Sequence, residues 1–143
     1  MSSSGYSGTP LAKKLGIKEG TTVVTVAAPK GYAKLLEPLP LGVKITSRAS
    51  PAPAFVHVFA TERRALESTL QRLRKSLAQD GMVWVSWPKQ SSGVATDITE
   101  DVIREVALPL QFVDVKVCAV DETWSGLKVV IRREARRVDA AKR

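Results

Sequence analysis

The sequence predicts a three-layer α/β domain with a mostly parallel sheet of about six strands that ends in an antiparallel pair. Apolar, β-branched runs alternate with segments of helical periodicity along the 143 residues, which is typical of strand–helix units. The length suits one domain with a single core. The last two apolar runs are joined by a short turn, which leaves no room for a crossover helix and therefore favours antiparallel pairing.

The first half of the chain alternates strands with short helices. Thr9 as N-cap and Pro10 at the first helical position predict a helix that ends at Gly16. A second brief helix over 32–36 is stopped by Pro38. The strands expected in this half are 21–28, 43–48 and 54–60. The first and third are apolar almost throughout, so we expect both faces of the sheet to be covered there.

The second half contains the longer helices. Leucines at helical spacing predict a helix over 61–79 with one buried face. Asp97, followed three residues later by Glu100, has the pattern of an N-cap with a capping box, and Pro109 marks the end of that helix. The strands expected in this half are 82–87, 113–120 and 127–132, with Trp124–Gly126 as the turn between the last two.

Composition excludes several classes of protein. Cys118 and His57 are the only cysteine and histidine, so we expect neither an internal disulfide nor a metal site built from several such residues. No apolar stretch reaches the roughly 20 residues of a membrane helix, and the first ten residues do not resemble a secretory signal. We therefore expect a soluble, cytoplasmic protein that does not interact with membranes.

The positive charge is concentrated at the carboxyl terminus. The chain has 22 basic and 14 acidic residues, and its net charge of +8 lies mostly in the last sixteen residues. We interpret residues 1–8 as a flexible segment, 9–133 as the domain and 134–143 as a basic tail. The tail residues that could hold phosphates are Arg132, Arg133, Arg136, Arg137, Lys142 and Arg143. No aromatic residue lies among them to stack on bases, so solubility is the favoured explanation of this charge.

Three segments carry a resemblance to a known family. They are SGTPLAKKLGI, DGMVWVSWPKQSSGVATDITEDVIREVALPL and VDVKVCAVDETWSGLKVVIRR. Together they closely resemble the bacterial domain-of-unknown-function family 3052 (DUF3052) over roughly residues 5–133. More distantly, LAQDGMVWVSWP resembles the helix–turn–strand element late in the sheet of class I S-adenosylmethionine methyltransferases. That resemblance implies a Rossmann-like fold from which one strand–helix unit is missing.

The same resemblance identifies where a cofactor would bind. Such enzymes carry a glycine-rich turn after the first strand and an acid after the second, which bonds the ribose. This chain has Ala27–Gly31 (AAPKG) and Thr46–Arg48 (TSR) at those places. One glycine and a proline restrict backbone approach to a nucleoside, and Arg48 repels the sulfonium. We therefore predict no cofactor, and a binding role in place of methyl transfer.

These substitutions suggest an anion-binding crevice at the carboxyl ends of the strands. Three cations lie on the loops expected there, and a Gly/Ser turn follows the third. The candidate residues are Lys30, Gly31, Arg48, Trp87, Lys89, Ser91, Ser92 and Gly93. The competing interpretation is that these are solvated loop cations, because the carboxylates of Asp97, Glu100 and Asp101 would oppose a phosphate nearby.

The remaining candidates are structural or lie at an interface. His57 and Cys118 lie within apolar strands, where a hydrogen-bonded imidazole and a buried thiol are expected. Trp84 is expected in the core, and Trp124 on its turn is an interface candidate. We expect a non-catalytic binding or regulatory module for an anionic small molecule or a protein partner. The alternatives are a small methyltransferase-like enzyme with an atypical cofactor site and nucleic-acid association through the tail.

Overall fold

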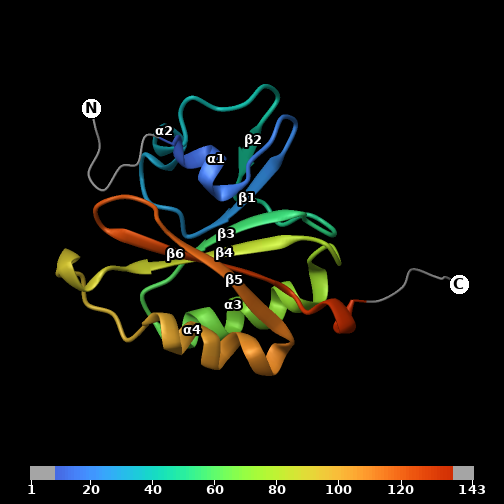
Figure 1. Ribbon diagram of the computed structural model, residues 1–143, viewed down its shortest axis with the longest axis vertical. Coiled ribbons are helices and arrows are strands. Elements are labelled where there is room, and N and C mark those ends of the chain that lie inside the picture. Colours follow the sequence, from blue (N-terminus) through green and yellow to red (C-terminus); the bar gives the residue numbers. More distant parts are fainter. Residues whose placement is uncertain (1–8, 137–143) are drawn as a thin grey trace, which may run out of the picture.

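The computed structural model describes residues 9–136 (Figure 1). The segment predicted to be flexible, residues 1–8, lies outside the described residues, as do Arg137, Lys142 and Arg143 of the tail. The division into a domain at 9–133 and a tail at 134–143 stays a prediction.

Six strands form one sheet in the order β2-β1-β3-β4-β6-β5. The strands are β1 (Thr22–Val26), β2 (Lys44–Thr46), β3 (Phe55–Phe59), β4 (Met82–Pro88), β5 (Phe112–Ala119) and β6 (Trp124–Ile131). Neighbours from β2 to β4 pair in parallel, whereas β6 pairs antiparallel with both β4 and β5. The predicted fold class is confirmed, including the terminal antiparallel pair.

Helices cover both faces of this sheet (Figure 1). The helices α1 (Leu11–Leu15) and α2 (Tyr32–Leu35) lie on one face, and α3 (Arg63–Ser76) and α4 (Glu100–Ala107) lie on the other. Short 3-10 turns follow β4, α4 and β6. Within the described residues, no helix combines the length and apolar character needed to cross a bilayer.

Each face of the sheet has its own core. The leucine stripe of α3 packs with Ile103 of α4 on one face, over strand residues such as Val56 and Val83. On the other face Leu15 and Leu36 pack against Phe55 and Trp84. The prediction that Trp84 is a core residue is confirmed. It is fully buried, and its Nε1–H donates a hydrogen bond of 2.8 Å to the Leu15 carbonyl, which ties α1 to the centre of the sheet.

The predicted turn at Trp124–Gly126 is wrong, because these residues begin β6. The chain reverses at residues 120–123, where Asp121 Oδ1 accepts hydrogen bonds of 2.8 Å from the Thr123 and Trp124 amides. Gly126 is a close-packing residue: a Cβ there would lie 3.2 Å from the Trp84 ring and 3.3 Å from Val120. The glycine was therefore misinterpreted as a turn signal when it makes room for an indole.

The edge strand β5 contains an irregularity. Its register against β6 shifts between Asp114 and Lys116, so that Val115 is the extra residue of a bulge. Lys116 then lies directly opposite Lys128 of β6. Burial, together with the nearby charge of Lys116, lowers the pKa of Lys128. Val115 and Val117 are about half exposed on this strand, at 51% and 48%.

Two predicted helix starts are also wrong. Pro10 is the N-cap residue of α1, so this helix begins one residue later than the Thr9 cap predicted. The N-cap of α4 is Thr99, whose Oγ1 accepts a hydrogen bond of 3.2 Å from the Val102 amide. Asp97 caps a different helix: its Oδ1 accepts a hydrogen bond of 2.7 Å from the Arg63 amide at the first turn of α3.

Removing the Asp97 carboxylate should therefore destabilise α3. We expect Asp97→Ala to lower the free energy of unfolding by about 1 kcal/mol, as for other lost N-caps, because an amide at the positive end of the helix dipole loses its acceptor. Asp97→Asn keeps an acceptor oxygen and should recover most of this loss. Urea denaturation measures the difference.

The control for this prediction is Asp101→Ala. Asp101 belongs to the first turn of α4 and forms an exposed ion pair with Arg104, so its removal should cost no more than about 0.5 kcal/mol. An Asp97→Ala protein as stable as the wild type would show that the cap on α3 has no energetic role.

Candidate functional site

The carboxyl ends of β1 and β3 form the switch point of this sheet. From β1 the chain continues outward to β2 and then returns to β3 on the other side of β1. In open α/β sheets, ligands bind in the crevice outside the strand ends at such a point. This is therefore the place where a nucleotide-type cofactor is expected in the fold.

Aromatic side chains pack against one another beside this switch point. Tyr32, at the start of α2, lies edge-to-face on Phe59 at the end of β3, with ring centroids 5.5 Å apart. Phe59 in turn packs edge-to-face on Trp124 of β6 at 5.0 Å. Tyr32 is 4% exposed and Phe59 is 3% exposed, so this row of rings is part of the core. Trp124 is half-buried in it and does not stand free on a turn.

A buried polar chain fixes Tyr32 in this position. The Tyr32 hydroxyl lies 2.7 Å from Nδ1 of His57, and Nε2 of His57 lies 2.8 Å from Oγ of Ser86. The chain thereby links α2, β3 and β4. In either tautomer of a neutral imidazole one ring nitrogen donates and the other accepts, so both contacts are satisfied. The prediction that His57 is a hydrogen-bonded core residue is confirmed.

Burial determines the protonation states of His57 and Tyr32. It lowers the pKa of His57 to about 3, because the charged imidazolium loses its hydration. It raises the pKa of the Tyr32 phenol well above its usual range for the same reason. Both groups are therefore neutral at physiological pH. They hold α2 in place and offer no exposed nucleophile or base.

The three candidate cations lie at the carboxyl ends of the strands, each in the loop after a different strand. Lys30 follows β1, Arg48 follows β2 and Lys89 follows β4. Because β1 and β3 lie between β2 and β4, three strand spacings of about 4.8 Å separate the ends that carry Arg48 and Lys89, or about 14 Å. Lys30 lies on the loop after β1, the strand next to β2. A ligand that contacts all three must therefore be elongated.

The other predicted site residues are distributed unevenly. Gly31 and Gly93 both have positive φ, at the start of α2 and after the turn at Gln90–Ser92. Trp87 is 8% exposed and packs in the core between α3 and α4, so it does not line a crevice. The hydroxyl of Ser92 donates to the Lys89 carbonyl at 2.7 Å, which closes this turn on itself. Ser91 is exposed on the same turn.

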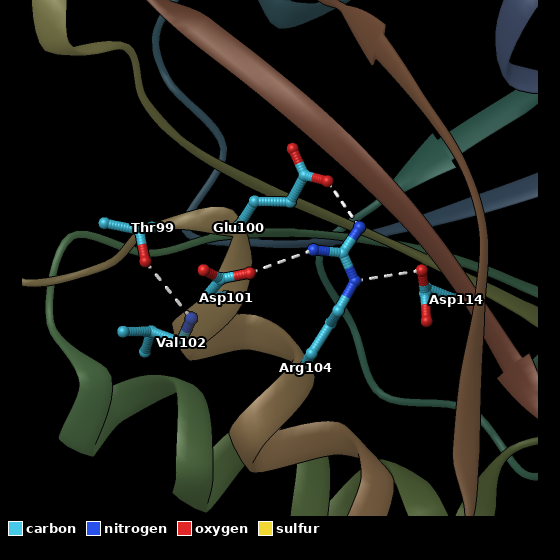
Figure 2. Close-up of polar contacts among 6 residues, drawn as sticks. All are labelled: Thr99, Glu100, Asp101, Val102, Arg104 and Asp114. Carbon is cyan, nitrogen blue, oxygen red and sulfur yellow. Dashed lines mark hydrogen bonds and ion pairs between the residues drawn. The ribbon is translucent and has the colours of Figure 1, made fainter.

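The carboxylates near this edge already have partners. Asp97 bonds the amide of Arg63, as described above. Glu100 and Asp101 both form ion pairs with Arg104, and Asp114 of β5 bonds the same guanidinium at 3.1 Å (Figure 2). The hydrogen bonds from Glu100 and Asp114 raise the pKa of Arg104. The three carboxylates expected to oppose an anion are thus engaged with other groups.

The described part of the tail is bound to the domain. Arg132 forms an ion pair of 3.3 Å with Glu134, and Arg136 Nε donates to the Ile131 carbonyl at 3.0 Å. Arg133 belongs to the short 3-10 turn between them.

Cys118 is half-buried, and burial raises the pKa of its thiol despite the opposing charges of Lys14 and Lys116. A protonated thiol is a weak nucleophile.

A groove of about 290 Å³ lies on the face of the sheet that α3 covers. Its floor is formed by Val24 and Val26 of β1 and Val56 of β3. The carboxyl-terminal half of α3 supplies one wall, with Leu73 and Arg72. The connection between β2 and β3 lines the opposite side, and the remaining lining residues are Thr25, Ala27 and Ser76. We call this feature the crossover groove. Its lining contains none of the eight predicted anion-site residues, although Ser47 and Ala49 on either side of Arg48 belong to it.

The groove follows from the length of one connection. The chain must return from the carboxyl end of β2 to the amino end of the parallel strand β3, and it does so with residues 47–54 alone. Such crossovers commonly need a dozen or more residues and contain a helix that covers the sheet. This one contains no helix, and Pro53 and the positive φ of Ala52 shape it as a thin strap. The strap therefore leaves a groove beside α3, in which Val24 and Val56 remain buried and Val26 is partly exposed.

The groove and the one cation among its lining residues, Arg72, were not predicted from the sequence. The available signal was the short proline-containing linker at 50–53 between two strands expected to be parallel. A connection too short for a helix implies an uncovered patch of sheet beneath it. Helical periodicity places Arg72 on the exposed face of its helix, but it does not show which exposed residue borders a cavity.

Comparison with solved structures identifies the fold. A candidate type 11 methyltransferase from Sulfolobus solfataricus matches with a TM-score of 0.61 at 13% identity, over 92% of this chain and 95% of that one. The chain has a class I methyltransferase-like Rossmann fold. A ribosomal protein L11 methylase from Lactobacillus delbrueckii subsp. bulgaricus matches with a TM-score of 0.57 at 13% identity, over 86% of this methyltransferase-like chain and 76% of the methylase.

A third structure extends the same likeness. The fibrillarin pre-rRNA processing protein of Methanococcus jannaschii matches with a TM-score of 0.55 at 8% identity, over 87% of this chain and 69% of that one. Identities this low show the fold alone. No protein-family profile matches the sequence, so the resemblance to DUF3052 stays a prediction. No curated protein matches the sequence either.

The buried histidine makes stability depend on pH. The pKa of His57 is about 3 in the folded protein and near the ordinary value of 6.5 when unfolded, so the unfolded chain binds more protons between these values. Its contribution to stability is fully present above pH 6.5 and is lost as the pH falls towards 3. We expect a loss of about 2 kcal/mol between pH 7 and pH 5 in denaturant titrations.

The control is His57→Gln, whose amide offers a donor and an acceptor but does not titrate. This variant should lose most of the pH dependence over the same interval. In the wild type, the imidazole resonances should also show no titration between pH 7 and pH 5 by NMR. A titration midpoint near 6.5 in the folded protein would contradict the burial argument.

Proposed function

We propose that this chain is a methyltransferase-like domain that no longer transfers methyl groups and binds a small anionic ligand. The observation that carries this proposal is the packing of Tyr32 on Phe59 beside the switch point. A cofactor seated between the ends of β1 and β3 would have to displace rings that are almost fully buried. Burial of an aromatic side chain contributes about 1.5–3 kcal/mol, and the Tyr32–His57 bond adds to that cost.

The loop after β1 supports the same conclusion. Pro29 has no amide hydrogen to donate, and Gly31, the single glycine, is used for the left-handed start of α2. After β2, Arg48 stands where an acid would be needed to bond ribose hydroxyls, and its charge repels a sulfonium.

The positive side chains at the carboxyl ends of the strands favour an anionic ligand. Lys30, Arg48 and Lys89 have no ion pair among those found within residues 9–136, whereas the neighbouring carboxylates have cationic or amide partners. Because the carboxyl ends of β2 and β4 are about 14 Å apart, the ligand should carry two or more anionic groups separated along its length. A nucleotide with several phosphates, or another elongated polyanion, has this distribution of charge.

A small methyltransferase-like enzyme with an atypical cofactor site is the alternative, and the fold itself favours it. Binding of S-adenosylmethionine separates the two proposals, because the binding module should not recognise a sulfonium beside its lysines. A protein partner over Trp124 and nucleic-acid binding through the basic tail are the other interpretations of the sequence. The half-buried Trp124 and the paired Arg132 give them less support.

The proposal predicts stabilisation by phosphate compounds at low salt. A ligand at a hundred times its dissociation constant adds about 2.7 kcal/mol, which should raise the midpoint of thermal unfolding by about 5 to 10 °C. The panel contains ADP, NADP, pyrophosphate, S-adenosylmethionine, its demethylated product and a short DNA duplex. We expect a shift with the phosphate compounds and none with S-adenosylmethionine.

Charge reversals locate the site. Lys30→Glu, Arg48→Glu and Lys89→Glu should each reduce the shift by at least half, since each introduces a repelling carboxylate. The matched control is Lys18→Glu, an exposed lysine at the opposite, amino-terminal ends of the strands. A shift that is unchanged in all three variants, or lost equally in the control, would disprove this site. A shift with S-adenosylmethionine alone would favour the enzyme.

A further inference from the structure

The crossover groove has the composition of a ligand site. Its floor consists of the valine side chains at 24, 26 and 56, which belong to or pack on the core between the sheet and α3. A volume of about 290 Å³ is at the lower end of the range for small-molecule pockets. It equals the liquid volume of about ten water molecules. Val24 and Val56 are buried and Val26 is partly exposed, so the apolar surface that a ligand can reach is that of Val26 with Ala27 and Ala49. Water over this surface gains few hydrogen bonds, and an apolar group can displace it favourably.

One charge borders this floor. Arg72 of α3 lines the groove, and no Asp or Glu among the described residues does so. The guanidinium of Arg72 makes one long contact, 3.5 Å from its Nη2 to Oγ1 of Thr69, and no ion pair with any carboxylate found in residues 9–136. It therefore has donors available for an anion. Hydroxyls of Ser47, Ser50 and Ser76 lie around the same rim.

We propose that the crossover groove binds a small monocarboxylate with a branched or aromatic apolar body, whose carboxylate pairs with Arg72. Val26, Ala27 and Ala49 contact the apolar body. The planar fork of one guanidinium matches a single carboxylate with two parallel hydrogen bonds. An inorganic anion would leave this apolar surface uncovered, and an uncharged apolar molecule would leave the guanidinium without its partner. A carboxylate on an apolar body satisfies both features.

This site is independent of the anion site proposed at the strand ends. The groove lies on the α3 face, and its lining includes neither Lys30 nor Lys89. Variants at those two lysines therefore serve as a test that separates the proposals. They should reduce the response to phosphate compounds by at least half and leave the response to carboxylates unchanged. Arg72 variants should have the opposite effect.

NMR titration of the full-length, 15N-labelled chain tests the proposal. The probes are 4-methylpentanoate, benzoate and phenylacetate, each compared with its primary amide, and inorganic phosphate. We expect saturable shifts at residues 24–27, in the strap at 47–50 and at the carboxyl end of α3. The amides should bind at least tenfold more weakly, because they lack the charge that Arg72 recognises. Phosphate alone should cause no shifts at the carboxyl end of α3; Ser47 and Ala49 flank Arg48 and respond to phosphate at the strand-end site.

Two pairs of matched variants on α3 complete the test. Arg72→Glu should weaken carboxylate binding at least tenfold, whereas Arg64→Glu, an exposed arginine outside the groove, should change it less than twofold. Ser76→Trp places a bulky ring over the floor and should abolish binding. Ser68→Trp, at an exposed position of the same helix away from the groove, should not. All four positions are on the surface, so the fold tolerates these changes.

Several results would overturn the proposal. Equal affinities for the carboxylates and their amides would show that Arg72 recognises nothing. Equal effects of the Arg72 and Arg64 variants would assign the binding to general charge. Shifts confined to α2 and the ends of β1 and β4 would place the carboxylates at the other site. Failure of every carboxylate to bind in the millimolar range would show that the groove is not a site for this class.

Discussion

The packing of the α1–α2 layer on the sheet depends on the hydrogen bonds of the neutral His57 imidazole. The imidazole lies in the middle of the sheet and bonds a phenol on one side and a hydroxyl on the other, so that α2, β3 and β4 are joined through one ring. A histidine can do this only while it is uncharged, because its two partners supply hydrogen bonds but no compensating negative charge. The position of Tyr32, and with it the aromatic packing beside the switch point, depends on that protonation state.

The two faces of the sheet consequently differ in what they offer a ligand. On the α1–α2 face, aromatic rings fill the space next to the switch point where this class of fold commonly binds a cofactor. On the α3 face, the strap between β2 and β3 is too short to carry a helix, and a groove remains beside α3 that reaches Ala27 and Ser47 at the carboxyl ends of β1 and β2. A shared fold therefore need not imply a shared binding place.

The sequence predicted most of the fold because its strongest signals are local. Apolar runs such as 54–60 and the leucine stripe of α3 each determine an element without help from distant residues, and their order along the chain implies a parallel sheet. The errors arose where a local pattern has a distant partner. Asp97 has the sequence context of a cap for the following helix, but the structure brings it to α3. Gly126 resembles a turn residue until Trp84 is packed against it.

The candidate site was less predictable for the same reason. Strand direction alone places the loops after β1, β2 and β4 at the same end of the sheet. The separation of about 14 Å between the ends of β2 and β4 follows from the order of the strands, which the sequence does not show. Trp87 was expected at a crevice because it is next to Lys89. Its side chain instead packs in the core with α3 and α4, since alternate residues of a strand face opposite sides. The groove exists because the connection between β2 and β3 contains no helix. Residue patterns indicate the elements that form, and they show poorly where an element is missing.

The bulge at Val115 has a consequence for how this molecule behaves among its own copies. β5 is a sheet edge with half-exposed valines, which is the kind of surface that recruits further strands and leads to aggregation. The extra residue bends the backbone out of register, and Lys116 and Lys128 face each other beside it although like charges repel. A second β5 brought alongside would meet a distorted ladder and a doubled positive charge. The cost accepted in one cross-strand pair thus protects an open sheet against polymerisation.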